Sequence, residues 1–170
     1  LSDIGKLKEA ELCQRKAIEL NPDFANAHFN LGNVLRNLGN LKEAEISYRK
    51  AIELKPDLAD AHSNLGVILS DIGKLKEAEL CQRKAIKLNP AFASAHSNLG
   101  SILKDLGKLQ EAELYTRKAI ELNPNFANGY YNLGNILRDL GKLQEAEISY
   151  RKAIELNPNY AIAYSNLGSI

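Results

Sequence analysis

The sequence contains three histidines and two cysteines, the side chains that most often bind metals or act as nucleophiles. His28, His62 and His96 recur every 34 residues, and Cys81 follows Cys13 at twice that interval. Packed helices lie about 8–10 Å apart, whereas the ligands of one zinc ion lie about 2 Å from it. If each interval forms one structural unit, the histidines lie too far apart to bind a single metal ion. By the same spacing the cysteines are too far apart for a disulfide. We therefore expect no metal site and no cofactor.

Charged residues form pairs four residues apart that recur along the chain, such as Glu45 with Arg49 and Glu113 with Arg117. On a helix such pairs lie on one exposed face and contribute a few tenths of a kcal/mol each. No acid–base pair stands out from this pattern. An active site needs unlike residues that converge on one point, and near-identical periods do not provide them, so we predict that this chain is not an enzyme.

Five asparagines that recur at the same interval are the most informative polar residues: Asn30, Asn64, Asn98, Asn132 and Asn166. A carboxamide offers one acceptor and two donors, so it can bind the N–H and C=O groups of a peptide unit. Units stacked about 10 Å apart match roughly three residues of an extended chain at ~3.3 Å each. The asparagines therefore predict a ladder that binds the backbone of an extended peptide. In the alternative interpretation, each asparagine binds its neighbours and stabilises the packing between units.

Other candidate binding residues share this face of the predicted helices. They are the aromatic residues Phe29 and Tyr131, the further asparagines Asn33 and Asn135, and the acidic residues Asp71, Asp105 and Asp139. Together they predict a polar surface with an acidic edge and two aromatic side chains. We expect it to prefer neutral or mildly basic peptides to acidic ones.

A strict period organises the whole chain. The five prolines recur at this constant interval, and ten of the eleven glycines form two further series with the same spacing. With Ala25 as position 1 of a repeat, the sequence divides into a partial repeat at residues 1–24, full repeats at 25–58, 59–92, 93–126 and 127–160, and a partial repeat at 161–170. We predict a single all-α array, because one such unit cannot bury its apolar face alone but stacked neighbours can.

Each full repeat is predicted to form two helices, here named helix A and helix B. In the first full repeat the apolar stripe of helix A has the i, i+3, i+4, i+7 spacing of one helical face: His28, Leu31, Gly32 and Leu35. Gly39 is expected to end helix A with a positive φ. Pro56 ends helix B, because the residue before a proline disfavours the helical conformation. The predicted buried side of helix B consists of Leu41, Ala44, Tyr48, Ala51, Ile52 and Leu54.

The spacing of Leu31-Gly32, Ala44, Tyr48 and Pro56 resembles the tetratricopeptide repeat, and the resemblance covers the whole chain. It implies a right-handed superhelix, an α-solenoid, whose helices A line a concave groove that binds other proteins. Position 4, an aromatic in the family, is histidine in three repeats, and position 24 is Gln14, Gln82 or Thr116 in three copies.

The asparagine ladder most resembles the repeats of protein O-linked N-acetylglucosamine transferases, in which such asparagines hold peptide substrates. The resemblance is limited to the position-6 asparagines, and no glycosyltransferase domain lies in these 170 residues. Co-chaperones of the same family that clamp a terminal carboxylate need Lys or Arg at positions 2, 5 and 6. This chain has no basic residue at those positions, so that function is disfavoured.

Composition narrows the function further. A net charge of +1 argues against a nucleic-acid surface, and no stretch approaches the ~20 apolar residues that span a bilayer. We predict a protein-interaction module that binds an extended peptide. The alternatives are a substrate-recruiting arm of a larger enzyme, such as a glycosyltransferase, and a scaffold that self-associates end to end through uncapped terminal repeats. The location stays open, with the cytoplasm favoured.

Overall fold

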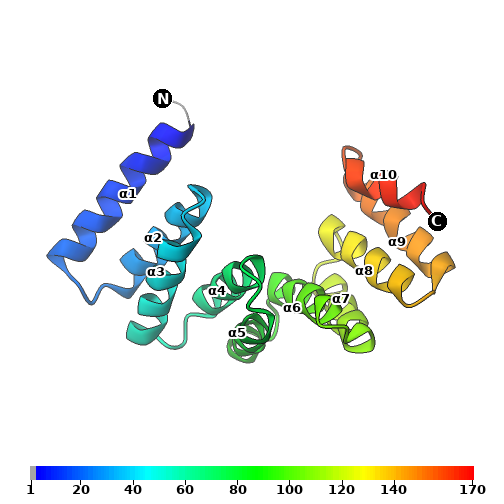
Figure 1. Cartoon of the computed structure of the whole chain (residues 1–170), viewed down its shortest axis with the longest axis horizontal. Helices are drawn as coiled ribbons and strands as arrows, with labels where there is room; N and C mark the ends of the chain where they lie inside the picture. Colours follow the sequence, from blue (N-terminus) through cyan, green and yellow to red (C-terminus); the bar gives the residue numbers. More distant parts are fainter. Residues whose placement is uncertain (1–2) are drawn as a thin grey trace. The chain divides into compact units, whose positions relative to one another are not determined.

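The structure is a computed structural model that describes residues 3–170, and within that range it contains ten α-helices and no β-strand (Figure 1). The chain divides into two compact units, Leu1–Asn89 and Pro90–Ile170. The first unit contains α1 (Asp3–Leu20), α2 (Ala25–Asn37), α3 (Leu41–Leu54), α4 (Ala59–Asp71) and α5 (Leu75–Leu88). The second contains α6 (Ala93–Asp105), α7 (Leu109–Leu122), α8 (Ala127–Asp139), α9 (Leu143–Leu156) and α10 (Ala161–Leu167). The prediction of an all-α fold is confirmed.

Each full repeat forms a helical hairpin, with helix A packed against helix B. In the hairpin of α2 and α3, Gly39 has a φ of 80°, which a residue without a Cβ adopts at little cost. Its N–H donates to the carbonyl of Arg36 at 3.0 Å, and the N–H of Asn40 donates to the carbonyl of Leu35 at 2.8 Å. These are the two hydrogen bonds of a Schellman motif. The predicted end of helix A at Gly39 is confirmed.

The first partial repeat departs from this pattern. Gly5 occupies the same repeat position as Gly39, but α1 continues through it as one long helix (Figure 1).

The core forms where helix A meets helix B. Leu31, Leu35, Ala44 and Ala51 are buried as predicted, whereas His28 is only half-buried. The side chain at position 24 of each full repeat is completely buried, whether it is Tyr48, Gln82, Thr116 or Tyr150. It lies against the glycine at position 8 of helix A, because a Cβ there would overlap it. The small glycine therefore makes room for a large or polar side chain in the core.

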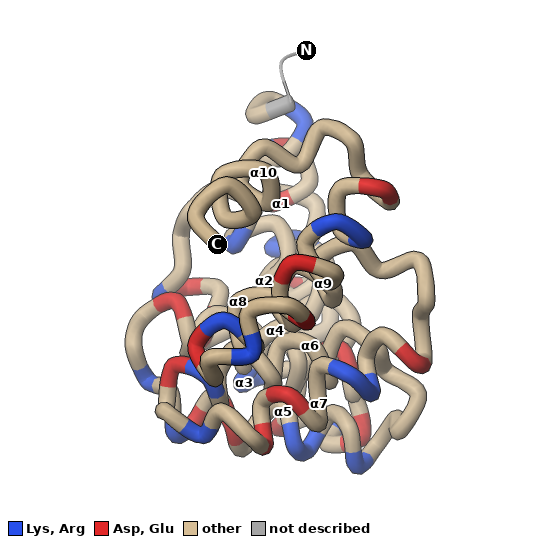
Figure 2. The backbone as a smooth tube through the Cα atoms, turned by 90° about the vertical axis from the view of Figure 1, so that its right-hand side faces the viewer, with Lys and Arg blue, Asp and Glu red and all other residues tan. Residues whose placement is uncertain are grey.

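The helices B carry most of the charged residues, on the side that we call the outer face, and residues of both signs are interspersed along them (Figure 2). Arg49 in α3 pairs with Glu45 of its own helix at 2.8 Å and with Glu77 of α5 at 2.9 Å. Lys74 adds a second link between these helices by pairing with Glu45 at 3.2 Å. These ion pairs connect successive repeats within a unit. Since most of the side chains stay solvated, each pair contributes little to stability.

None of the helices in the described range, residues 3–170, is both long enough and apolar enough to cross a membrane.

The close contact at position 8 generates a prediction about stability. A Cβ added at Gly134 would lie 2.6 Å from Cε1 of Tyr150, whose ring is fully buried and has no room to move. We expect Gly134→Ala to lower the free energy of unfolding by about 1–3 kcal/mol, as overpacked cores do. Urea denaturation followed by circular dichroism measures the change.

Gly168 provides the matched control, because it occupies the same repeat position and its added Cβ would meet only backbone oxygens at 3.6 and 3.7 Å. Gly168→Ala should leave the urea concentration at the midpoint of unfolding nearly unchanged. Equal midpoints for the two variants would contradict this account of the core.

Candidate peptide-binding surface

The predicted binding residues lie on the helices A of both units. We call the side chains at positions 5, 6, 9 and 13 of these helices the helix-A surface of each unit. Within the first unit α2 contacts α4, and within the second unit α6 contacts α8. The position-6 asparagines are half-buried, except for Asn30, which is exposed. All five therefore retain some contact with solvent.

In the first unit, four side chains form a cluster that we call the first tyrosine cluster: Phe29, Asn33, Tyr48 and Asn64. The hydroxyl of Tyr48 donates to Oδ1 of Asn33 at 2.7 Å, and Nδ2 of Asn64 donates to the same oxygen at 2.8 Å. The ring of Phe29 lies 6.0 Å from the ring of Tyr48, centre to centre. Burial raises the pKa of Tyr48, so its hydroxyl stays a proton donor at neutral pH.

The second unit repeats this arrangement three repeats later, in a second tyrosine cluster formed by Tyr131, Asn135, Tyr150 and Asn166. Oδ1 of Asn135 accepts from the hydroxyl of Tyr150 at 2.7 Å and from Nδ2 of Asn166 at 2.9 Å. The rings of Tyr131 and Tyr150 are again 6.0 Å apart. Burial also raises the pKa of Tyr150. The aromatic residues and asparagines predicted from sequence come together in both units.

The other predicted asparagines are arranged differently. Nδ2 of Asn132 donates to Oγ of Ser97 at 3.2 Å, which links α8 to α6. Neither Asn30 nor Asn98 makes a side-chain hydrogen bond to another residue of the described range. The asparagine ladder thus includes residues that link repeats and residues whose carboxamides are free to bind other groups.

The acidic edge of the surface is partly neutralised. Asp105 pairs with Lys104 at 3.3 Å, and Asp139 pairs with Arg138 at 3.5 Å. Asp71 is exposed at the end of α4. The helix-A surface of the second unit therefore carries nearly balanced charges.

The sequence analysis assigned Tyr48 only to the core and did not single out its counterpart Tyr150, so it missed the role of both. Both side chains start in a helix B, pass the glycine of helix A and donate from their buried hydroxyls to Asn33 and Asn135 of the helix-A surface. A signal was present in the sequence, since the two full repeats with tyrosine at position 24 are also those with asparagine at position 9 and an aromatic residue at position 5.

The histidines have a structural role. In each, Nε2 lies within hydrogen-bonding distance of the carbonyl of the proline six residues earlier: His28 to Pro22 at 2.8 Å, His62 to Pro56 at 3.0 Å and His96 to Pro90 at 2.9 Å. Because a carbonyl only accepts, Nε2 must carry the proton. Each histidine thereby ties helix A to the loop that precedes it. No group of three or more potential metal ligands occurs in residues 3–170.

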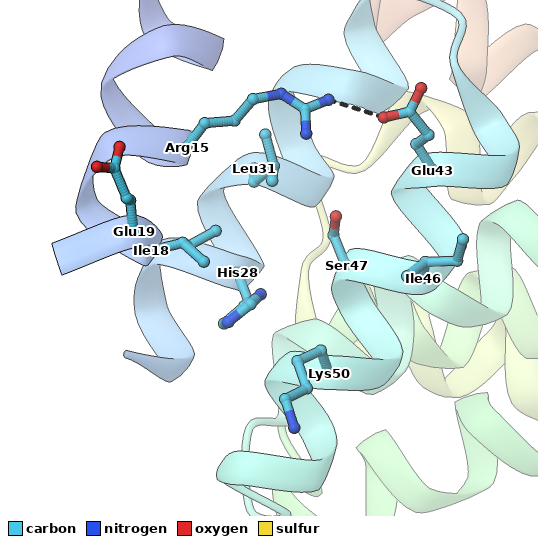
Figure 3. Close-up of a pocket in the computed structure, with 9 residues that line it drawn as sticks. All are labelled: Arg15, Ile18, Glu19, His28, Leu31, Glu43, Ile46, Ser47 and Lys50. Atoms are coloured by element: carbon cyan, nitrogen blue, oxygen red, sulfur yellow. Dashed lines mark hydrogen bonds and ion pairs between the residues drawn. The ribbon is translucent and has the colours of Figure 1, made fainter. Parts of the chain in front are cut away.

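A cavity of about 530 Å³ lies among α1, α2 and α3 (Figure 3). Ile18, Leu31 and Ile46 contribute apolar walls. Arg15 and Glu43 form an ion pair of 2.7 Å across the cavity. The other charged residues in its lining, Glu19 and Lys50, also have partners within their own helices. Few polar groups remain to orient a ligand, so the cavity supports no specific function.

The fold and this surface together define an all-α protein built from helical hairpins with polar helix-A surfaces. The chain belongs to the tetratricopeptide repeat family. Four family models, described as tetratricopeptide or TPR repeats, match residues 1–24 and 59–92, 13–46, 32–73, and 93–126 and 127–160. This family is generally non-catalytic, and its members bind protein or peptide partners. No match was found among curated proteins.

Solved structures of similar fold include one that is described as a TPR protein. YrrB, described as a TPR protein with an unusual peptide-binding site, is 28% identical, with a TM-score of 0.78 over 97% of this chain and 85% of its own. MamA is 25% identical, with a TM-score of 0.81 over 92% of both chains. PilF of Pseudomonas aeruginosa is 23% identical, with a TM-score of 0.84 over 97% of this chain and 81% of its own, which indicates a shared fold.

The two cysteines provide a chemical test of the structure. Cys13 is exposed, whereas Cys81 is half-buried, and burial raises the pKa of its thiol to about 11. Because the thiolate is the reactive form, we expect a disulfide reagent at pH 8 to modify Cys81 on the order of 100-fold more slowly than a thiol of ordinary pKa. Cys13 should react rapidly. Measurements on Cys13→Ser and Cys81→Ser assign the two phases, and equal rates would contradict the described packing of α5.

Proposed function

We propose that this chain is a protein-interaction module whose helix-A surfaces bind an extended peptide segment. The observation that carries the proposal is the asparagine at position 6 of all five helices A. Unlike the charged residues of the outer faces, which pair with one another, these carboxamides retain hydrogen-bonding groups for a ligand. The peptide-binding site named for YrrB, a structure of the same fold, supports this function.

The chemistry of the surface favours recognition of peptide backbone. Carboxamides are uncharged and carry both donors and acceptors, so they match the alternating N–H and C=O groups of an extended chain. Each hydrogen bond contributes only about 0.5–1.5 kcal/mol, and useful affinity therefore requires several repeats to act together. Similar repeats, each contributing one weak contact, satisfy this requirement. The resemblance of the position-6 asparagines to those of protein O-linked N-acetylglucosamine transferases remains a prediction.

The proposal is tested by peptide-array binding with the triple variant Asn64→Ala, Asn98→Ala and Asn132→Ala. We expect it to lose most of the peptides that the wild-type chain binds, because three carboxamides are removed from the surface. Affinities of selected peptides, measured by fluorescence anisotropy, should fall about 10-fold or more if each lost hydrogen bond contributes its usual share.

The control is a second triple variant on the outer faces of the helices B, with the exposed residues Lys42, Lys76 and Gln110 changed to alanine. Circular dichroism and thermal melting must show that both variants stay folded, since Asn64 and Asn132 also make hydrogen bonds between repeats. If peptides bind both triple variants as well as they bind the wild type, the asparagines have only a structural role. Concentration-dependent size without any peptide binding would favour the scaffold alternative.

The charges of the surface predict a preference among peptides. Asp105 and Asp139 are offset by neighbouring bases, while Asp71 has no ion-pair partner within the described range. We expect neutral or mildly basic peptides to bind about 3-fold or more tightly than acidic versions of the same length at low ionic strength, because like charges repel. Anisotropy titrations with matched peptides measure this ratio. Tighter binding of the acidic versions that depends on the position-6 asparagines would contradict it.

A further inference from the structure

The two tyrosine clusters contain the same kinds of residues in the same repeat positions. Each has an aromatic ring at position 5, asparagine at position 9, tyrosine at position 24 and asparagine at position 6 of the next repeat. The two intervening repeats have none of the first three: they carry Ser63, Val67 and Gln82, and Ser97, Ser101 and Thr116. The three residues therefore occur together or not at all within the full repeats.

The tyrosine hydroxyl is the part of each cluster that comes from the core. Gly32 lets the ring of Tyr48 pass close to α2, because a Cβ at that position would lie 2.6 Å from Cε1 of the ring. The ring is fully buried, and the hydroxyl ends at the carboxamide of Asn33. In the next repeat the shorter Gln82 instead binds Ser63, with its Nε2 donating to the Ser63 carbonyl at 2.9 Å. Gln82 thus satisfies its polar groups without reaching an asparagine at position 9, whereas the buried hydroxyl of Thr116 in the following repeat has no hydrogen-bond partner within the described residues.

The hydrogen bonds determine how both carboxamides of a cluster are oriented. Oδ1 of Asn33 has two lone pairs, and it accepts one hydrogen bond from Tyr48 and one from Asn64. Its Nδ2, with two N–H donors, is left without a hydrogen bond in the described range. Asn64 uses Nδ2 toward Asn33, which leaves its Oδ1 as an acceptor. One N–H donor group and one C=O acceptor therefore lie next to each other, each on a different repeat.

This pairing of a donor with an acceptor favours a ligand that carries both a C=O group and an N–H group. A carboxylate would be repelled by the oxygen of Asn64, and a cation would be repelled by the amino group of Asn33. A peptide unit or a primary carboxamide offers its C=O to the amino group of Asn33 and its N–H to the oxygen of Asn64. In the second cluster, Asn135 and Asn166 have the same orientation.

We propose that each tyrosine cluster is a subsite for one amide group of the bound peptide, and that Tyr48 and Tyr150 are its positioning residues. The inference rests on the proposed function and deepens it. The recognition unit is a pair of asparagines from successive repeats rather than each position-6 asparagine alone. The tyrosine does not touch the peptide but holds the position-9 carboxamide with its amino group outward.

The variants Tyr48→Phe and Tyr150→Phe test the positioning role, since each removes one hydroxyl and keeps the ring. Without a ligand, Tyr48→Phe should shift the side-chain amide NMR resonances of Asn33 and Asn64 and leave those of Asn135 and Asn166 unchanged. Tyr150→Phe should do the reverse. Tyr130→Phe is the control, because the Tyr130 hydroxyl has no hydrogen bond within residues 3–170. Unchanged resonances in both test variants would overturn the positioning role.

Binding is measured with a fluorescein-labelled copy of the peptide that binds the wild-type chain most tightly on the array, together with copies in which single backbone amides are N-methylated. We expect Tyr48→Phe or Tyr150→Phe to weaken binding about 3- to 10-fold. The N-methylated copies should identify at least one backbone N–H whose loss weakens binding to a similar degree. In Tyr48→Phe that same methylation should have less effect if its N–H binds at the first cluster.

A double-mutant cycle separates positioning from general destabilisation. If Tyr48 acts through Asn33, the double variant Tyr48→Phe with Asn33→Ala should bind no more weakly than Asn33→Ala alone. Independent, multiplicative losses would overturn the inference. If peptides bind and Asn64→Ala weakens them but Tyr48→Phe does not, the inference fails while the proposed function holds. If no array peptide binds the wild-type chain, both fail.

Discussion

The close approach of helix A to helix B at one glycine is the constraint on which the rest of each repeat depends. With only a hydrogen in place of a side chain, Gly32 allows the ring of Tyr48 to pack directly against the backbone of α2. That contact buries the largest side chain of the hairpin and sets the distance between the helices. It also places the buried Tyr48 hydroxyl against Asn33, a residue of the helix-A surface. Packing and surface chemistry are therefore coupled through one position.

The asparagines of the helix-A surface combine two roles that the sequence presents as alternatives. Asn64 donates to Asn33 and so links α4 to α2, which is the structural role. The same hydrogen bond uses only its amino group and leaves its oxygen free, which is what a binding role requires. Since a carboxamide has separate donor and acceptor atoms, one side chain can stabilise the array and still present a defined group to a partner.

The two sides of each hairpin differ in how their polar groups are satisfied. On the outer face, Arg49 and Arg117 each bridge two successive helices B, and their partners lie within the same chain. On the helix-A surface, charges are few and several carboxamide groups have no hydrogen-bond partner among residues 3–170. Unsatisfied but uncharged groups lose little when they leave water for a matching ligand, whereas paired charges gain little from a new partner. This contrast explains why the helix-A surface, rather than the outer face, is the better candidate for binding.

The period, the two helices of each repeat and the residues that end them could all be predicted from the sequence alone. These features depend on local spacing: an apolar stripe defines a helical face, Gly39 permits a positive φ, and Pro56 stops a helix whatever lies around it. The sequence also placed the position-6 asparagines on one face. Which atoms of those asparagines are used depends on how the repeats pack, because Asn64 donates to Asn33 of another repeat and Asn33 also accepts from Tyr48, which comes through the core. Local spacing determines where a side chain points, but the groups that it meets there depend on how the helices pack.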